Sequence, residues 1–132
     1  AEAAGVTAVI IGGGSCDPYN PKVVRSTMGA IFRVPFIICD DLVDIVGELK
    51  KRGVIAYGAH LAGEDLYDID FPDKTAFLIG NEGNGLSREV ADTADRLLRI
   101  PMEGKVESLN AAISATLLSY EAMRQRRSAR QN

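Results

Sequence analysis

The sequence predicts an α/β fold, with a mostly parallel sheet and flanking helices. Short apolar runs alternate with segments that carry helix signals along the whole chain. Strands that alternate with helices usually run parallel to one another. Glycine-rich turns follow two of the apolar runs, at Gly12 to Gly14 and at Gly80 to Gly85. Ligands of open parallel sheets bind beyond the carboxyl ends of the strands, so a ligand site is expected where the chain leaves the apolar runs that end at Ile79 and at Ile100.

Five strands are expected, at residues 6–11, 35–39, 54–57, 76–79 and 96–100. The first, VTAVII, is a continuous β-branched run, which is typical of a strand that is buried on both faces. Residues 58–73 lack a clear period and are expected to form a loop-rich crossing. His60 has no recognisable partner in the sequence and is interpreted as a residue of that loop.

Helix signals follow most of these strands. Residues 1–4 resemble the last turn of a helix, with Gly5 just beyond it. Residues 42–49 carry apolar side chains at helical spacing, and Gly53 ends that helix. The expected N-caps of the four helices after Gly5 are Asn20, Asp40 or Asp41 (for the helix at 42–49), Ser87 and Ser108.

Composition indicates one globular domain over residues 1–132. Hydrophobic residues make up 46% and charged residues 25%, and no apolar run reaches the roughly 18 residues of a membrane span. Cys16 and Cys39 lack metal-binding spacing and are expected to be free thiols of a cytoplasmic protein that needs no metal. The net charge is −3, yet the last twelve residues carry four Arg against one Glu. A nucleic-acid partner would therefore be held by local basic patches.

Two stretches each leave a strand and enter a helix: FLIGNEGNGLS at Phe77–Ser87, and IPMEGKVESLNAA at Ile100–Ala112. The first is not a Walker loop, because no Gly-Lys-Ser/Thr follows. It is not a dinucleotide fingerprint either, because the glycine order differs and the helix starts late. Local sequence leaves two interpretations open, a plain strand-to-helix connection and a ligand-binding turn. The polar side chains of the two stretches that could do chemistry are Glu82, Ser108 and Asn110.

Both stretches closely resemble the second and third motifs of the SpoU (TrmH-type) branch of the SPOUT RNA methyltransferases. SCDPYNPKVVRSTMGAIFRVPF is similar to the segment between that family's first and second motifs. The resemblance implies methyl transfer from S-adenosylmethionine to a ribose 2′-hydroxyl of RNA, with rRNA favoured over tRNA. It also implies a C-terminal trefoil knot, which composition could not suggest, and a homodimer with the last helix in the interface.

Residue by residue, the resemblance places the cofactor against Gly80, Ile100, Met102 and Leu109. It makes Glu82 and Asn110 organisers of the loops and the RNA site, with a purely structural role as the alternative for Glu82. Ser108 is expected to cap the last helix and could also contact the substrate. Lys22 and Arg25 lie at helical spacing and are expected to contact RNA phosphate, with Arg33 extending the pair, although a solvated basic face remains the alternative.

One part of the family pattern has no match. The first motif, Asn-x-Gly-x-x-x-Arg, does not occur in these 132 residues, which begin with the AEAAG stretch that follows it in the family. The domain is therefore expected to be N-terminally incomplete, and to bind the cofactor but methylate RNA more slowly than a chain that includes that Arg. Two alternatives stay open: a SPOUT-like module that binds RNA or dimerises without catalysis, and an unrelated nucleotide-binding α/β protein.

Overall fold

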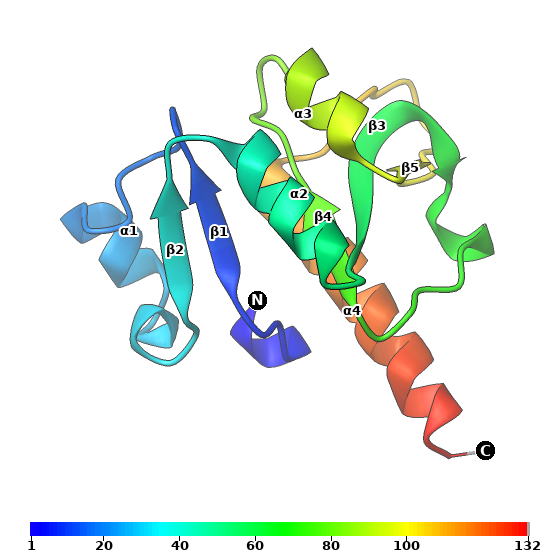
Figure 1. Cartoon of the computed structure of the whole chain (residues 1–132), viewed down its shortest axis with the longest axis horizontal. Helices are drawn as coiled ribbons and strands as arrows, with labels where there is room; N and C mark the ends of the chain where they lie inside the picture. The colour runs from blue at the N-terminus through cyan, green and yellow to red at the C-terminus, as the bar shows by residue number, and fades with distance from the viewer. Residues whose placement is uncertain (132) are drawn as a thin grey trace.

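All strand ladders in the computed structural model, which describes residues 1–131, are parallel (Figure 1). Strands β1 (Val9–Gly12) and β2 (Phe36–Cys39) form one pair. A second group places β3 (Ile55–Asp65) between β4 (Thr75–Leu78) and β5 (Arg96–Arg99). The predicted α/β class with parallel strands is confirmed, whereas the trefoil knot remains a prediction.

Helices lie on both sides of the strands. Figure 1 shows α2 (Leu42–Lys51) in front of β4 and α4 (Ala111–Ala129) behind it, with the last turns of α4 projecting from the body. The shorter helices are α1 (Pro21–Ser26) and α3 (Arg88–Thr93), and single 3₁₀ turns are η1 (Glu2–Ala4), η2 (Ala30–Phe32) and η3 (Leu66–Asp68). Three of the four predicted N-caps are confirmed, because side-chain oxygens of Asn20, Asp41 and Ser87 accept backbone N–H groups of the first turns.

Strand β3 is much longer than the sequence suggested. It pairs with β5 twice: Ala59 lies opposite Leu98, and Glu64 lies opposite the same Leu98. The four residues between them bulge outward around β5. Gly63 permits this close approach, because a Cβ there would lie 2.4 Å from the Leu98 backbone. The expectation of a loop is therefore wrong for residues 58–65. This segment forms a strand because it pairs with β5, although its own sequence has no strand periodicity.

The core joins α4 to the three-stranded group. Leu66, Leu98 and Leu118 are fully buried, and Tyr57, Phe71 and Phe77 pack as an aromatic group beside them, with ring centroids 5.0 to 6.2 Å apart. Gln125 fixes α4 to the segment before β4, since its amide donates to the Ile69 carbonyl and accepts from the Phe71 N–H, both at 2.8 Å. One end of α4 is thereby held against the core.

Glu121 is the buried charge of this helix. Its carboxylate accepts hydrogen bonds from Arg124 and from Gln125, and the Arg124 bond holds the pKa of Glu121 below its ordinary value. Within residues 1–131, no helix has both the length and the apolarity that a membrane crossing requires.

The β1–β2 pair is less covered than predicted. Val9 to Ile11 are only half-buried, and β1 begins three residues later than the apolar run. Ile37 and Ile38 of β2 are both about half exposed, at 53% and 52%. Successive strand residues point to opposite faces, so both faces of β2 are open in the described chain. The expectation that the first strand is buried on both faces is wrong. Too few side chains of the described residues pack against β1 to bury Val9 to Ile11.

Candidate functional site

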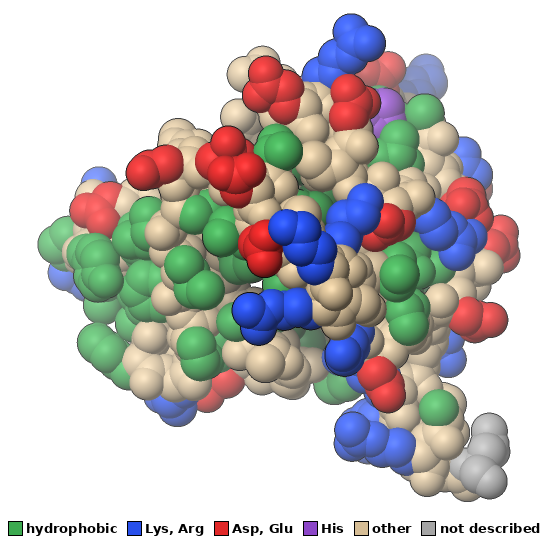
Figure 2. Space-filling model, in the orientation of Figure 1, with side chains coloured by type: hydrophobic (Ala, Val, Ile, Leu, Met, Phe, Trp, Pro, Cys, Tyr) green, Lys and Arg blue, Asp and Glu red, His purple; other side chains and the backbone are tan. Residues whose placement is uncertain are grey.

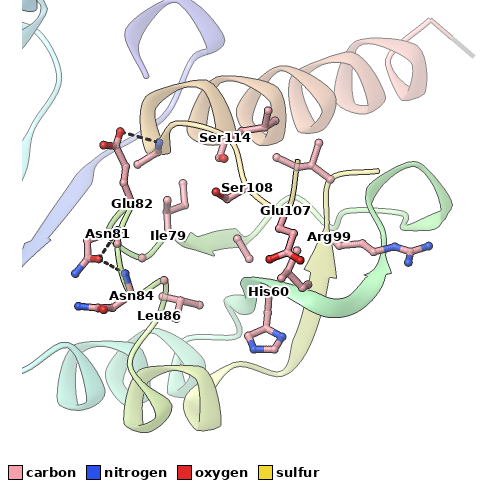
Figure 3. A pocket seen from close by; sticks show the side chains of 18 of the residues that line it. His60, Ile79, Asn81, Glu82, Asn84, Leu86, Arg99, Glu107, Ser108 and Ser114 are labelled. Carbon is pink, nitrogen blue, oxygen red and sulfur yellow. Dashed lines mark hydrogen bonds between the residues drawn. The ribbon is translucent and has the colours of Figure 1, made fainter. Parts of the chain in front are cut away.

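A cavity of about 370 Å³ lies beyond the carboxyl ends of β4 and β5 (Figure 3). Its walls are the glycine-rich loop after β4, the chain that leaves β5, the start of α4 and the bulge of β3. All but one of the residues that the sequence assigned to cofactor or catalysis line it: Gly80, Glu82, Ile100, Met102, Ser108 and Leu109. The fold thus brings the two glycine-containing stretches to one place, while the role of each residue in binding stays a prediction.

The glycine-rich loop is folded tightly on itself. The Asn81 side-chain oxygen accepts from the N–H groups of Gly83 at 3.0 Å and Asn84 at 2.7 Å. The Gly85 N–H donates to the Asn81 carbonyl, and Gly85 adopts the left-handed conformation with φ +66°. Gly80 has a different reason to be glycine, since a Cβ there would lie 1.9 Å from the Gly85 carbonyl carbon. The loop closes only because that space is empty.

Glu82 connects this loop to the second stretch. Its carboxylate accepts hydrogen bonds from the Asn110 side-chain amide and, at 3.4 Å, from the Ala111 N–H at the start of α4. A carboxylate beside a helix N-terminus is favoured by the free N–H groups and the helix dipole. The two side chains predicted to organise the loops are therefore in direct contact, and Figure 3 shows Glu82 at the left of the cavity.

Asn110, and not Ser108, caps α4. The Asn110 oxygen accepts from the N–H groups of Ala112 at 2.9 Å and Ile113 at 3.3 Å. The prediction of Ser108 as the cap is wrong because the helix begins two residues later, and Asn is as good a cap as Ser. Asn110 therefore has two roles: its side-chain oxygen caps the start of α4, and its side-chain NH₂ group donates a hydrogen bond to Glu82. Ser108 is left free to face the cavity (Figure 3).

The interior of the cavity is mainly apolar, with polar atoms at the rim. Its apolar lining comes from Ile79, Leu86, Leu98, Ile100, Met102 and Leu109. Backbone groups of the two loops lie next to this surface, an arrangement that suits a flat heterocycle with donors and acceptors on its edge.

Outside the glycine-rich loop, four polar residues of the cavity were not predicted: His60, Arg99, Glu107 and Ser114. His60 is not a loop residue but belongs to β3, at the point where the bulge leaves β5. Its Nδ1 accepts from the Ala62 N–H at 3.1 Å, which turns the imidazole along the rim. No local signal in the sequence marks His60, because its place at the cavity depends on the pairing of β3 with Leu98 of β5.

Comparison with known proteins identifies the chain. The SpoU rRNA Methylase family matches over residues 1–120. This chain belongs to that family. It is 39% identical to the 23S rRNA (guanosine-2'-O-)-methyltransferase RlmB of Xanthomonas campestris over 96% of its length and 51% of the relative's. It is 38% identical to the 23S rRNA (guanosine(2553)-2'-O)-methyltransferase RlmP of Bacillus subtilis, over 91% and 48%.

Solved structures of the SpoU family agree with the fold. The SpoU methyltransferase AviRb of Streptomyces viridochromogenes, solved in complex with AdoMet, superposes with a TM-score of 0.89 at 36% identity, covering 96% of this chain and 53% of that one. The AdoMet-bound rRNA methyltransferase of Sinorhizobium meliloti superposes with a TM-score of 0.86 at 37% identity, over 93% and 48%. The chain therefore spans about half the length of these relatives. An unrelated nucleotide-binding protein is excluded by this membership.

The basic residues that were predicted to bind RNA do not line the cavity of this SpoU site. Lys22 and Arg25 belong to α1, which Figure 1 places beyond β2, and neither makes an ion pair within residues 1–131. Arg33 is engaged, because its guanidinium pairs with both carboxylate oxygens of Glu2 and ties η2 to η1. Their contact with phosphate remains a prediction.

Metal-ligating side chains are not gathered at this SpoU site. Residues 1–131 contain no group of three or more His, Cys, Asp or Glu that could hold an ion. Both cysteines are free thiols, with Cys16 exposed and Cys39 half-buried. Burial, together with the nearby carboxylates of Asp40 and Asp41, raises the pKa of Cys39, so that this thiol is a poor ligand at neutral pH.

Proposed function

We propose that this chain is the cofactor-binding and methyl-transferring domain of an RNA 2′-O-ribose methyltransferase that acts on rRNA. One observation carries the proposal: the two SpoU motifs line one cavity and are joined beside it by the hydrogen bond from the Asn110 amide to Glu82. The names of the relatives, which specify 23S rRNA and 2′-O methylation, support the substrate class. The alternative of a module without catalysis draws on no observation of the structure.

The cavity has the size and lining that S-adenosylmethionine requires. Small-molecule sites typically measure about 300 to 1,000 Å³ and are mostly apolar with a few polar groups, and this cavity of about 370 Å³ meets both conditions. Gly80, Ile100, Met102 and Leu109 would hold the cofactor, with main-chain groups of the loops contacting the adenine edge. When bound, S-adenosylmethionine supplies an electrophilic methyl group on a sulfonium ion.

The remaining residues would position the RNA. Methyl transfer to a hydroxyl requires alignment of the acceptor oxygen and removal of its proton. Glu82 and Asn110 would keep the target ribose in place at the mouth of the cavity, and Ser108 would contact it. We assign proton removal to the Arg of the first SpoU motif, which is not among these 132 residues. Lys22, Arg25 and Arg33 would contact phosphates, and the reaction would use no metal.

Calorimetry with S-adenosylmethionine and a methylation assay on 23S rRNA test this function together. We expect the 132-residue chain to bind the cofactor, because all four residues proposed to hold it line the cavity. We expect methyl transfer to be roughly 10² to 10⁴-fold slower than by a chain extended N-terminally through the first motif, the usual effect of losing a general base. Equal rates at equal folded fractions would place the base within these residues. Lack of cofactor binding by both chains would overturn the function.

We further propose a cytoplasmic homodimer that uses α4. Ile113 and Tyr120 are 52% and 43% exposed on this helix, while Leu118 on its opposite side is fully buried. Large apolar side chains exposed along one helix commonly mark an interface. Light scattering at micromolar concentration should give twice the 14.2 kDa of one chain, and a monodisperse monomer would contradict the dimer.

A further inference from the structure

Four cations gather at the end of the molecule opposite the cavity. We call them the basic edge: Arg52, Lys74, Arg126 and Arg130. The Lys74 ammonium donates to the Arg52 carbonyl at 3.0 Å, next to the start of β4. The Arg126 guanidinium donates to the carbonyl of Asp73 at 2.8 Å. Arg126 and Arg130 line a hollow of about 440 Å³ together with Asp73 and Ala129. These contacts connect Lys74 to Arg52 at one place, and Arg126 and Arg130 to Asp73, the chain neighbour of Lys74, at another.

The charges of the basic edge are not neutralised within residues 1–131. Three neighbouring cations are ion-paired: Lys50 with Asp95, Lys51 with Glu48, and Arg124 with Glu121, at 2.6 to 2.9 Å. The members of the basic edge form no such pair. Asp73 is the one carboxylate that lines the hollow, so two guanidinium groups share it with a single carboxylate, in a chain whose net charge is −3.

This surface is accessible. Arg52, Lys74 and Arg130 are exposed, and Arg126 is half-buried with an Nε donor that has no acceptor in the described part of the chain. Figure 1 shows the last turns of α4 projecting from the body, and Figure 2 shows Lys or Arg side chains near that projecting end. Ion pairing accounts for Lys50, Lys51 and Arg124 but includes none of the four cations of the basic edge within residues 1–131.

We propose that the basic edge binds the phosphate backbone of the RNA substrate, at a site separate from the cavity. The proposal rests on the function proposed above. Guanidinium groups match phosphate oxygens with two parallel hydrogen bonds, and Arg126 and Arg130 lie one helical turn apart on the same face. The basic edge would hold RNA without reading its sequence, because phosphate contacts position a nucleic acid and base contacts specify it.

The distance to the cavity fits a folded RNA. Nineteen residues separate Ala111, on the cavity wall, from Arg130, and at about 1.5 Å per residue this part of α4 is about 28 Å long. A duplex that rises roughly 3 Å per base pair would span it with about nine base pairs. A stem could therefore rest on the basic edge while an unpaired nucleotide beside it enters the cavity.

The test is RNA affinity as a function of salt, measured by fluorescence anisotropy with a labelled RNA hairpin of about 20 base pairs. The double variant Arg126→Gln/Arg130→Gln should bind about tenfold more weakly than the wild type at low salt. Its slope of log affinity against log salt should be smaller by between about one and two, since each lost phosphate contact removes about 0.7 to 0.9. Arg130→Gln alone, which breaks no hydrogen bond of its side chain within residues 1–131, should give about half of the change in slope.

Lys51→Gln is the matched control, because it removes the same charge next to Arg52 from a residue already paired with Glu48. It should leave both affinity and slope nearly unchanged. An equal loss of RNA affinity in all three variants would show a general charge effect and overturn the proposal. An RNA affinity of the double variant equal to that of the wild type would also overturn it. A change of oligomeric state without a change in RNA affinity would assign the basic edge to a second copy instead.

Calorimetry with S-adenosylmethionine on the same variants separates this proposal from the proposed function. Cofactor affinity should not change, since the cavity lies at the other end of α4. If the wild type binds the cofactor but none of the variants alters RNA affinity, the basic edge is refuted while the function stands. If the wild type binds no cofactor, the function itself fails.

Discussion

Replacement of Gly80 by Val should abolish S-adenosylmethionine binding, with an affinity at least 100-fold below that of the wild type. A Cβ at this position would lie 1.9 Å from the Gly85 carbonyl carbon and 2.1 Å from the Leu86 nitrogen. These are backbone atoms that no side-chain rotation can move, so the loop must open. Opening would displace the wall of the cavity and the backbone groups proposed to contact adenine. Calorimetry measures the loss directly.

Gly83→Ala is the control within the same loop. A Cβ at residue 83 would meet only the Asn81 side-chain oxygen, at 3.7 Å, which is ordinary contact. Its φ is not in the left-handed range, so an alanine causes little strain. This variant should bind the cofactor within a few-fold of the wild type. Circular dichroism should show that both variants keep their helices. Full cofactor affinity in a folded Gly80→Val protein would place the cofactor elsewhere.

Local patterns predicted much of this fold. Asn20 before Pro21, Asp41 before an amphipathic run and Ser87 before a short helix are signals contained in a few neighbouring residues, and each helix begins where its signal places it. The cavity could also be located, because glycine turns at the carboxyl ends of parallel strands converge on one edge of the sheet. The family resemblance then supplied the activity, which no local pattern contains.

Features that depend on distant partners could not be predicted. The bulge of β3 exists because Ala59 and Glu64 both pair with Leu98, more than 30 positions away in the chain. His60 reaches the cavity only as a consequence of that bulge. The solvent exposure of β2 depends on which elements pack against Ile37 and Ile38. An apolar run in the sequence does not show whether such elements are present. Asn110 was missed as a cap because Ser108 offers an equally good local signal two residues earlier.

The contact between Glu82 and Asn110 makes the two motifs one mechanical unit. Asn110 uses its oxygen on the N–H groups of α4 and its amide on the Glu82 carboxylate. Movement of α4 is therefore transmitted to the glycine-rich loop and to the cavity wall. Gln125 anchors the same helix to the core near its other end. Helix α4 is thus fixed near one end by the core and at the other end by the site.

Asn110→Ala should slow methyl transfer by about 10²-fold in the N-terminally extended chain, the usual magnitude when one positioned donor of a catalytic site is lost. The substitution removes the cap, at about 1 kcal/mol of unfolding free energy, and it also leaves Glu82 without its amide donor. Because the apolar lining is untouched, affinity for S-adenosylmethionine should fall much less than the rate. Single-turnover methylation of 23S rRNA, calorimetry and thermal unfolding measure the three quantities.

Asn110→Ser separates the cap from the contact with Glu82. A serine oxygen can still accept the N–H groups of the first turn of α4, so thermal stability should return close to that of the wild type. Its shorter side chain does not carry the amide that reaches Glu82, so methyl transfer should stay about as slow as in the alanine variant. A serine variant that is both stable and fast would show that the contact with Glu82 is dispensable and that Asn110 acts only as a helix cap. A serine variant that is stable and slow would assign the rate to the position of the Glu82 carboxylate.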